Sequence, residues 1–294
     1  MKKKRENTSG LEGGFNLPIY LILLIPALYV FGWLYWFIKH KSPNGNLPKI
    51  ISFHKISDTP ELGGTFNTTS QFESFMKCLH EEGYTTRGIT ESIENVHEKN
   101  ILIFFDDAYE NIYLKAFPVM KKYGFTGVLC PISDYVGKRN LWDRGVNKFK
   151  HMNPAQLKEM SERGFEIISH SKTHRDLRKL NSRELTIEVV DSKRELETML
   201  CRNIDYFIYP FGLYDERVKK AVREAGYKGA FASYNYRNDY LDKFAIGRNT
   251  MYIIDSVFDL KIILNRSPLV LFGHEDQKGR IINWFSRFSS VIKV

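Results

Sequence analysis

Residues 101–111 read Ile-Leu-Ile-Phe-Phe-Asp-Asp-Ala-Tyr-Glu-Asn, an apolar run that ends abruptly in two adjacent carboxylates. Five consecutive apolar residues rich in Ile and Phe predict a strand that is buried on both faces. Buried acids are costly unless they are paired, hydrogen-bonded or bound to a metal. The carboxyl end of such a strand is also where α/β sheets bind ligands. Asp106 and Asp107 are therefore either functional groups, or a helix cap followed by a solvated acid.

The composition is that of a folded protein, with 43% hydrophobic and 26% charged residues in a chain of 294. This length allows one sizeable α/β domain and an appendage. The three cysteines, Cys78, Cys130 and Cys201, are widely spaced and form no Cys-x-x-Cys pair. They predict neither a disulfide framework nor a thiolate zinc site. Cys130 lies in an apolar run, and we expect it to be a small buried residue.

The net charge of +9 is unevenly distributed, because residues 1–48 contain six basic and only two acidic residues. The remaining charge is small for a large domain, and no arginine-rich run accompanies it. The composition therefore does not indicate nucleic-acid binding.

The N-terminal region predicts a membrane anchor. Residues 17–38 contain no charge, are long enough for a bilayer core of about 30 Å, and carry aromatic residues towards their ends. A cleaved signal peptide would have a shorter apolar core and a small-residue cleavage site, so we expect an uncleaved signal anchor. The basic cluster at 2–5 places residues 1–16 in the cytoplasm. Residues 39–48 are then a linker, and 49–294 form an extracytoplasmic domain.

Strand-like and helix-like segments alternate along this domain. Strands are expected at 49–54, 101–105, 126–132, 165–169, 206–209, 229–232 and 269–273, and helices at 70–82, 113–123, 154–163, 182–200, 215–225 and 256–265. Repeated β-then-α units with continuously apolar strands predict a parallel sheet covered by helices, closed into a barrel.

Several of these strands end in residues capable of chemistry, which a parallel barrel would bring to one face. The strand ends are His54, Asp106-Asp107, His170 to His174, Tyr209 to Gly212, and His274. His170 and His174 would project from one side of a helical turn and could share a metal with an aspartate. Such a site leaves coordination positions open for water, as catalytic zinc sites do. Because strand side chains alternate, one aspartate could bind the metal while the other acts as a base.

These motifs resemble those of polysaccharide deacetylases of carbohydrate esterase family 4, which share the NodB-homology domain. The similar segments are Phe105 to Tyr109, Ser169 to His174, Tyr209 to Tyr214 and Leu271 to His274, joined by 156–164 and 224–227. The early strand ending in Phe53-His54 and the Tyr-Pro-Phe-Gly motif are most similar to membrane-associated deacetylases of poly-N-acetylglucosamine.

The resemblance implies a distorted (β/α) barrel that removes N-acetyl groups from a glycan with the help of a divalent metal. Asp107, His170 and His174 would bind the metal, Asp106 would be the general base and His274 the general acid. Zinc is expected, although similar sites also take nickel or cobalt. Tyr209, Pro210, Phe211, Gly212 and His54 would lie at the substrate. His54 could instead touch the metal or simply hydrogen-bond inside the barrel.

The sequence departs from the family pattern in three places. Ala108 replaces the usual glycine after the aspartate pair, and the chain ends twenty residues after His274. Many family members also carry an arginine before the Pro-Tyr motif that steadies the base, and no arginine stands at 206–209 here. Two alternatives stay open: a catalytically impaired glycan-binding module, motivated by Ala108 and the absent arginine, and a deacetylase of a small or lipid-linked sugar, motivated by the expected membrane anchor.

Other residues are expected to be ordinary parts of the fold. Core positions are expected at Tyr206, Phe207, Phe231 and Phe258, and solvated positions at His80, His97 and His151. Trp142, Asp143 and Arg144 either line a sugar groove or are loop residues.

Overall fold

The computed structural model describes residues 47–59, 64–140, 149–233 and 241–265, all of which belong to one compact unit, Ser42–Val294. The expected anchor at 17–38, nearly all of the linker and the expected strand at 269–273 lie outside these residues. Within the described ranges, no helix is both long and apolar enough to cross a membrane.

Seven parallel strands form the main sheet, which confirms the predicted parallel architecture. Their order is β6-β5-β4-β1-β9-β8-β7. The sheet curls until its two edges meet, since Ser169 forms a bridge with Phe207 just beyond β6. The strands are β1 (Lys49–Phe53), β4 (Ile101–Asp107), β5 (Val128–Pro131), β6 (Glu166–Ile167), β7 (Tyr206–Ile208), β8 (Gly229–Ser233) and β9 (Ile246–Thr250), and a small second sheet pairs β2 (Lys55–Ile56) with β3 (Phe66–Asn67).

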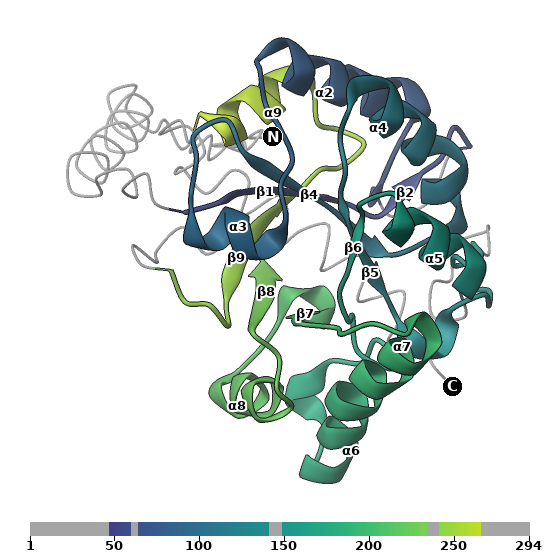
Figure 1. Cartoon of the computed structure of the whole chain (residues 1–294), viewed down its shortest axis with the longest axis vertical. Coiled ribbons are helices and arrows are strands. Elements are labelled where there is room, and N and C mark those ends of the chain that lie inside the picture. Colours follow the sequence, from purple (N-terminus) through teal and green to yellow (C-terminus); the bar gives the residue numbers. More distant parts are fainter. Residues whose placement is uncertain (1–46, 60–63, 141–148, 234–240, 266–294) are drawn as a thin grey trace, which may run out of the picture. The chain divides into compact units, whose positions relative to one another are not determined.

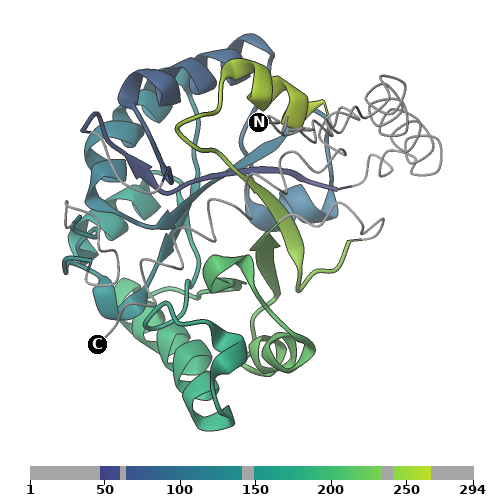
Figure 2. The ribbon, with the colours of Figure 1, turned by 180° about the vertical axis from the view of Figure 1, so that it is seen from behind.

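Helices other than α3 surround the outside of the curled sheet, and α2 lies beside both α4 and α9 (Figures 1 and 2). The described helices are α2 (Thr69–Glu81), α3 (Ile89–Glu94), α4 (Phe117–Tyr123), α5 (Pro154–Glu162), α6 (Ser182–Thr186), α7 (Ser192–Leu200), α8 (Glu216–Glu224) and α9 (Val257–Leu264). The segment expected as one helix at 182–200 is α6 and α7 joined by a π-helical turn, Ile187–Asp191. Side-chain caps such as Asp215, which accepts from Val218 N–H at 2.8 Å, begin several of the helices.

The sheet separates two apolar cores, because neighbouring residues of a strand face opposite sides. In β4, Ile103 and Phe105 pack outward against the helices, whereas Leu102 and Phe104 point into the curl of the sheet. Every residue of β4 is buried, as its apolar run predicts. The short helix α3 adds Ile89 and Ile93 to the inner core. Asp106 follows in the inward series, and this places its carboxylate inside the curl.

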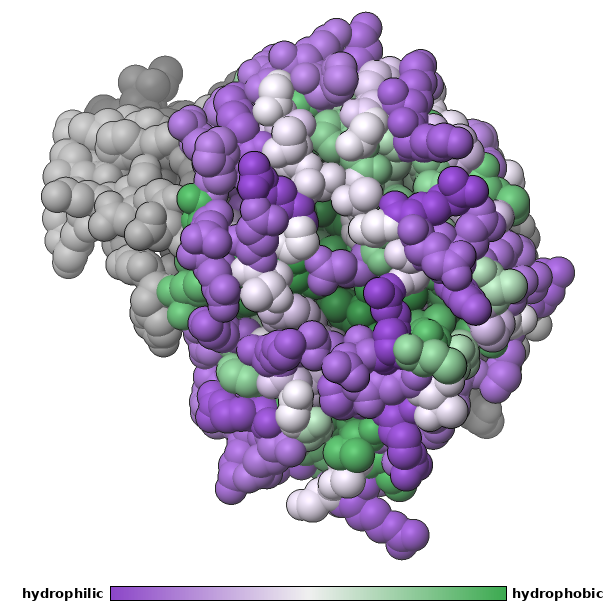
Figure 3. Space-filling model, in the orientation of Figure 1, coloured by the Kyte–Doolittle hydropathy of each residue, from purple (hydrophilic) through white to green (hydrophobic). Residues whose placement is uncertain are grey.

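The expected core residues are buried with one exception. Tyr206, Phe207 and Phe231 are buried, but the side chain of Phe258 is 67% exposed, so that prediction was wrong. Phe258 stands on the outer side of α9, whereas Leu260, Ile263 and Leu264 on the opposite side of the same helix are buried in the core. On the face shown in Figure 3, polar residues predominate and apolar residues form small patches between them.

Strand β9 was not predicted. Its sequence, Ile-Gly-Arg-Asn-Thr, has one apolar residue and two residues that disfavour strands. It is nevertheless a central strand, because it pairs with β1 on one side and β8 on the other. Tertiary pairing therefore decides this element, and it delivers the polar residues Arg248 and Thr250 to the inside of the sheet. Thr250 meets Ser52 there at 3.0 Å between the hydroxyl oxygens.

Candidate active site

The described strand ends converge as predicted, and they carry a cluster of acids and histidines. His54 follows β1, Asp106 and Asp107 end β4, and His170 and His174 follow β6. His274, the expected general acid, lies outside the described residues, as do Trp142, Asp143 and Arg144.

Asp107, His170 and His174 have the geometry of a metal site. One potential ligand atom from each lies within 4.8 Å of the others. Asp107 Oδ1 is 3.5 Å from His170 Nε2 and 3.7 Å from His174 Nε2, close to the roughly 3.4 Å that separates ligand atoms around a tetrahedral zinc ion. This oxygen is buried and has no hydrogen-bond partner among the described residues. An orphaned carboxylate oxygen facing two imidazole nitrogens fits a divalent cation.

The two imidazoles are held in the form that binds metals. His170 Nδ1 lies 3.0 Å from the carbonyl oxygen of Ile208. Because a carbonyl only accepts, Nδ1 carries the proton and Nε2 keeps its lone pair for a ligand. Burial, helped by neighbouring histidines, lowers the pKa of His170 to about 4 and the pKa of His174 to about 3. Both rings are neutral near pH 7, so their contacts with Asp107 are not ion pairs.

The loop that carries both histidines is not helical, which corrects the expected helical turn. Ser171 and His174 adopt left-handed backbone conformations, with φ of 63° and 60°. The imidazole rings still approach each other, with 4.8 Å between their centroids. The four-residue spacing therefore brings the ligands together through a strained loop rather than through a helix face.

Asp106 forms a buried ion pair that the sequence did not predict. Arg248 Nη1 donates to both carboxylate oxygens, at 2.7 and 3.0 Å, and both side chains are at most 5% exposed. His54 Nε2 lies 3.5 Å from Asp106 Oδ2. Burial by itself would raise the pKa of Asp106, but Arg248, then His54 and His170, outweigh it and hold the pKa below its ordinary value. The carboxylate is therefore ionised and fixed in place.

Arg248 supplies, from another strand, the arginine that residues 206–209 lack. It enters from β9, the strand that was not predicted, and it is the only charged residue in the stretch 244–254. A single charge in an otherwise uncharged stretch is the signal that sequence reasoning could have used.

The alternative role of Asp106 as a helix cap finds no support, since its oxygens face Arg248 and His54.

The turn after the aspartate pair has a left-handed backbone, which is strained because Ala108 stands where the family usually has glycine. Asp107 and Ala108 have φ of 63° and 48°, and a left-handed alanine lowers the stability of the fold by about 1 kcal/mol. Two contacts hold the turn, from Met152 N–H to the Ala108 carbonyl at 2.9 Å and from His151 Nδ1 to the Asp107 carbonyl at 2.7 Å. His151 is 2% exposed and stacks on Tyr109, so its expected surface position was wrong. His80 and His97 are exposed, as expected.

The Tyr-Pro-Phe-Gly motif builds one wall of the site. Tyr209 is fully buried and donates its hydroxyl to the Phe244 carbonyl at 2.9 Å, which corrects its expected contact with substrate. Pro210 is buried as well, whereas Phe211 is half-buried with its ring 4.6 Å from that of His174. Gly212 has φ of 66°, and a Cβ there would lie 1.9 Å from Ser233 Oγ. Only glycine fits, so this residue fixes the turn that places Phe211.

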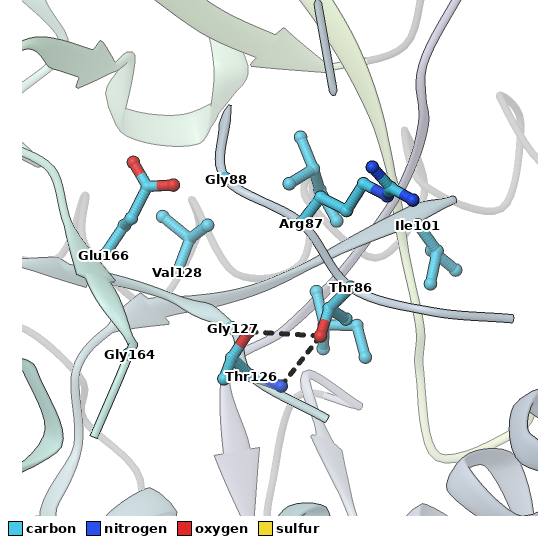
Figure 4. Close-up of a pocket in the computed structure, with 11 residues that line it drawn as sticks. Thr86, Arg87, Gly88, Ile101, Thr126, Gly127, Val128, Gly164 and Glu166 are labelled. Atoms are coloured by element: carbon cyan, nitrogen blue, oxygen red, sulfur yellow. Dashed lines mark hydrogen bonds between the residues drawn. The ribbon is translucent and has the colours of Figure 1, made fainter. Parts of the chain in front are cut away.

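A small pocket lies at the opposite end of the strands and is not part of this cluster (Figure 4). Its lining includes Thr86, Gly88 and Glu166, near the beginning of β4 and β5. Glu166 accepts a hydrogen bond from Ile89 N–H at 2.6 Å, and Thr86 Oγ1 accepts from Thr126 N–H at 2.9 Å. These contacts anchor the start of α3, which indicates a structural role.

Comparison with known proteins identifies relatives of this chain. A family model for polysaccharide deacetylases matches residues 93–230. YxkH of Bacillus subtilis (strain 168), named as a polysaccharide deacetylase, is 32% identical over 197 residues, which is 65% of each chain. The poly-beta-1,6-N-acetyl-D-glucosamine N-deacetylase of Staphylococcus aureus (strain MRSA252) is 25% identical over 60% of this chain and 64% of its own. The chain thus spans slightly less than two thirds of these relatives.

Solved structures share the fold. The deacetylase PplD of Streptococcus pyogenes, solved in complex with acetate, superposes with a TM-score of 0.64 at 20% identity, covering 74% of this chain and 97% of its own. IcaB of Ammonifex degensii gives a TM-score of 0.63 at 20% identity, covering 75% and 97%. At this identity the likeness establishes the fold alone.

Proposed function

Because this chain contains a polysaccharide deacetylase domain of the NodB-homology type, from carbohydrate esterase family 4, we propose that it removes N-acetyl groups hydrolytically from a polysaccharide that contains N-acetylhexosamine. The observation that carries this proposal is the placement of two aspartates side by side in different roles. Asp107 faces His170 and His174, whereas its neighbour Asp106 faces Arg248 and His54.

We assign the metal to Asp107, His170 and His174, with zinc as the expected ion and nickel or cobalt as substitutes. A bound divalent ion would polarise the amide carbonyl and lower the pKa of the attacking water. Asp106 would take the proton from that water, since it is ionised and Arg248 fixes its orientation. A backbone N–H near Phe211 would donate to the oxyanion, as in other acyl-transfer sites.

The leaving amine must be protonated before it departs, and a histidine suits this step. The family resemblance gives this role to His274. Among the described residues, His54 is also placed for proton transfer, since its Nε2 lies 3.5 Å from Asp106 Oδ2 and its side chain is 24% exposed. His54 is thus a second candidate for the acid, or a partner through which Asp106 passes its proton.

The alternative of an impaired glycan-binding module rests on two departures from the family pattern, and both have a local compensation. The turn at Ala108 is held by Met152, and Arg248 supplies the cation that 206–209 lack. Intact pairing of Asp106 favours an enzyme, because a binding module has no use for a fixed, ionised base. A small or lipid-linked sugar remains the alternative substrate, motivated by the expected anchor.

Acetate release tests the proposal. The purified full-length chain would be incubated with poly-β-1,6-N-acetylglucosamine, with chitin oligomers and with free N-acetylglucosamine, with and without a chelator. We expect release from a polymer, loss of that release with chelator, and recovery on adding zinc. Glycan binding without release from any substrate would favour the binding module. Release from the monosaccharide alone would favour a small-sugar deacetylase.

The metal ligands can be tested by composition. Changing both His170 and His174 to Ala should abolish the binding of one divalent ion per chain, because a single carboxylate cannot hold zinc tightly. Elemental analysis of purified protein measures this directly. The matched control is His97→Ala, which removes an exposed histidine and should keep the metal. Equal metal content in the double variant would show that the ligands are other residues.

We further propose that residues 17–38 anchor the chain in the cell membrane, with residues 1–16 in the cytoplasm and the deacetylase domain outside. Support comes from the uncharged span and the basic cluster that precedes it. Protease added to intact cells should therefore degrade the domain, and a cytoplasmic marker protein should survive. Full protection of the domain in intact cells, followed by digestion after lysis, would contradict this orientation.

A further inference from the structure

The loop between the two metal-binding histidines has an unusual set of backbone partners. The backbone N–H groups of Ser133 and Asp134, just after β5, donate to the carbonyls of Ser171 and Lys172 at 3.2 and 3.1 Å. His174 N–H donates to the side-chain oxygen of Ser171 at 3.1 Å. Buried backbone groups need such partners, and these contacts leave the N–H groups of residues 172 and 173 to be accounted for.

Both remaining N–H groups donate to one carboxylate, that of Glu188. Lys172 N and Thr173 N lie 2.9 and 2.8 Å from Glu188 Oε2, and the Thr173 hydroxyl donates to Oε1. Glu188 is only 3% exposed, although charged residues are rarely buried. Three donors from the loop therefore satisfy a buried acid that the proposed chemistry does not use.

A π-helical turn brings Glu188 to this place. It lies within Ile187–Asp191, between α6 and α7. The wide turn leaves the Val189 carbonyl to accept from the hydroxyls of Ser192 and Tyr227, both at 3.0 Å. Ser192 in turn accepts from the Ser169 hydroxyl at 2.9 Å, next to His170. Single π-helical turns within helices are rare and occur frequently at functional sites.

The loop needs this support because its backbone is strained. Ser171 and His174 have φ of 63° and 60°, and each left-handed non-glycine residue persists only where its surroundings determine it. Without the Glu188 contacts, the Lys172 and Thr173 N–H groups would be free to find other partners. The two histidines would then lose the fixed separation that lets them share one ion.

We propose that Glu188 is a positioning residue, which holds the backbone of residues 171–173 so that His170 and His174 face Asp107 before the metal arrives. This inference rests on the proposed metal-dependent function. It predicts that changes at Glu188 act first on metal affinity and only through it on catalysis.

The test compares Glu188→Ala with Glu188→Gln in the full-length chain. The Ala variant should bind zinc roughly 10–100-fold more weakly in competition with a chromophoric chelator, the range found for partners of metal ligands. Acetate release should fall at limiting zinc and recover substantially at saturating zinc. In the Gln variant, the amide oxygen can accept from both N–H groups while its NH₂ donates to the Thr173 hydroxyl. Its affinity should therefore stay within a few-fold of the original chain.

Controls separate positioning from general stability. Glu162→Gln removes an exposed acid of α5 and should change neither zinc affinity nor the unfolding midpoint of the metal-free protein. If Glu188→Ala does not fold, Thr173→Val removes only the hydroxyl contact and should still weaken zinc binding measurably. Unchanged zinc affinity in folded Glu188→Ala, or in Thr173→Val where Glu188→Ala does not fold, would overturn the proposal, whether or not the unfolding midpoint is lower. An original chain that binds no metal and releases no acetate would instead refute the proposed function itself.

Discussion

Replacing Asp106 with Asn is expected to leave the metal in place and to lower acetate release by roughly 10²–10⁴-fold, the usual contribution of a general base. The amide keeps the shape of the side chain but cannot accept the proton of the attacking water. Metal binding should survive, because the oxygens of Asp106 contact Arg248 and His54 rather than the Asp107 cluster. Acetate release and metal content should be measured on the same preparation.

The adjacent residue provides the matched control. Asp107→Asn weakens an anionic ligand and should lower metal content and acetate release together. If Asp106 were only a helix cap, its replacement would reduce stability by about 1 kcal/mol and change the rate little. Near-normal turnover in metal-loaded Asp106→Asn would end the general-base assignment and reopen the binding-module alternative.

Replacing Arg248 with Met should have the largest combined effect on stability and pH dependence. The variant leaves the carboxylate of Asp106 buried without its cation, and breaking a buried ion pair in this way lowers the free energy of unfolding by roughly 3–5 kcal/mol. Burial raises the pKa of Asp106, and Arg248 is the largest of the effects that oppose it. The pKa should therefore rise in the variant, and the acidic limb of the pH–rate profile should move to higher pH.

The sign of the pH effect on stability follows from the same pair. A carboxyl whose pKa is depressed in the folded state stabilises the protein above its unfolded pKa, and this contribution is lost as the pH falls through the folded value. In Arg248→Met, unfolding should become less sensitive to acid in that range. Urea unfolding at several pH values measures this, and Arg248→Lys, which keeps the charge, is the control. A pH–rate profile that does not move in Arg248→Met would show that Arg248 does not tune the base.

The fold class and most of the site could be predicted because their signals are local. The apolar run before Asp106 predicts a strand buried on both faces, since few other structures accommodate so many consecutive apolar residues. Repeated strand and helix patterns then predict parallel strands, whose ends must lie at one edge. For this reason His170 and His174 could be grouped with an aspartate of the 106–107 pair from the sequence pattern, although Asp107 and His170 are 63 positions apart in the chain, and the family resemblance singled out Asp107 as the ligand.

What the tertiary structure decided is the set of partners that surround these groups. Strand β9 carries too weak a local pattern to be predicted, yet pairing with β1 and β8 turns Arg248 towards Asp106. His151 and Glu188 look like ordinary surface residues in the sequence, and only packing buries them against the backbone of the turns that carry Asp107 and the two histidines. The physical reason is the same in each case. A residue type and its local spacing specify which chemistry is available, whereas burial, charge partners and backbone support come from segments that are distant in the chain.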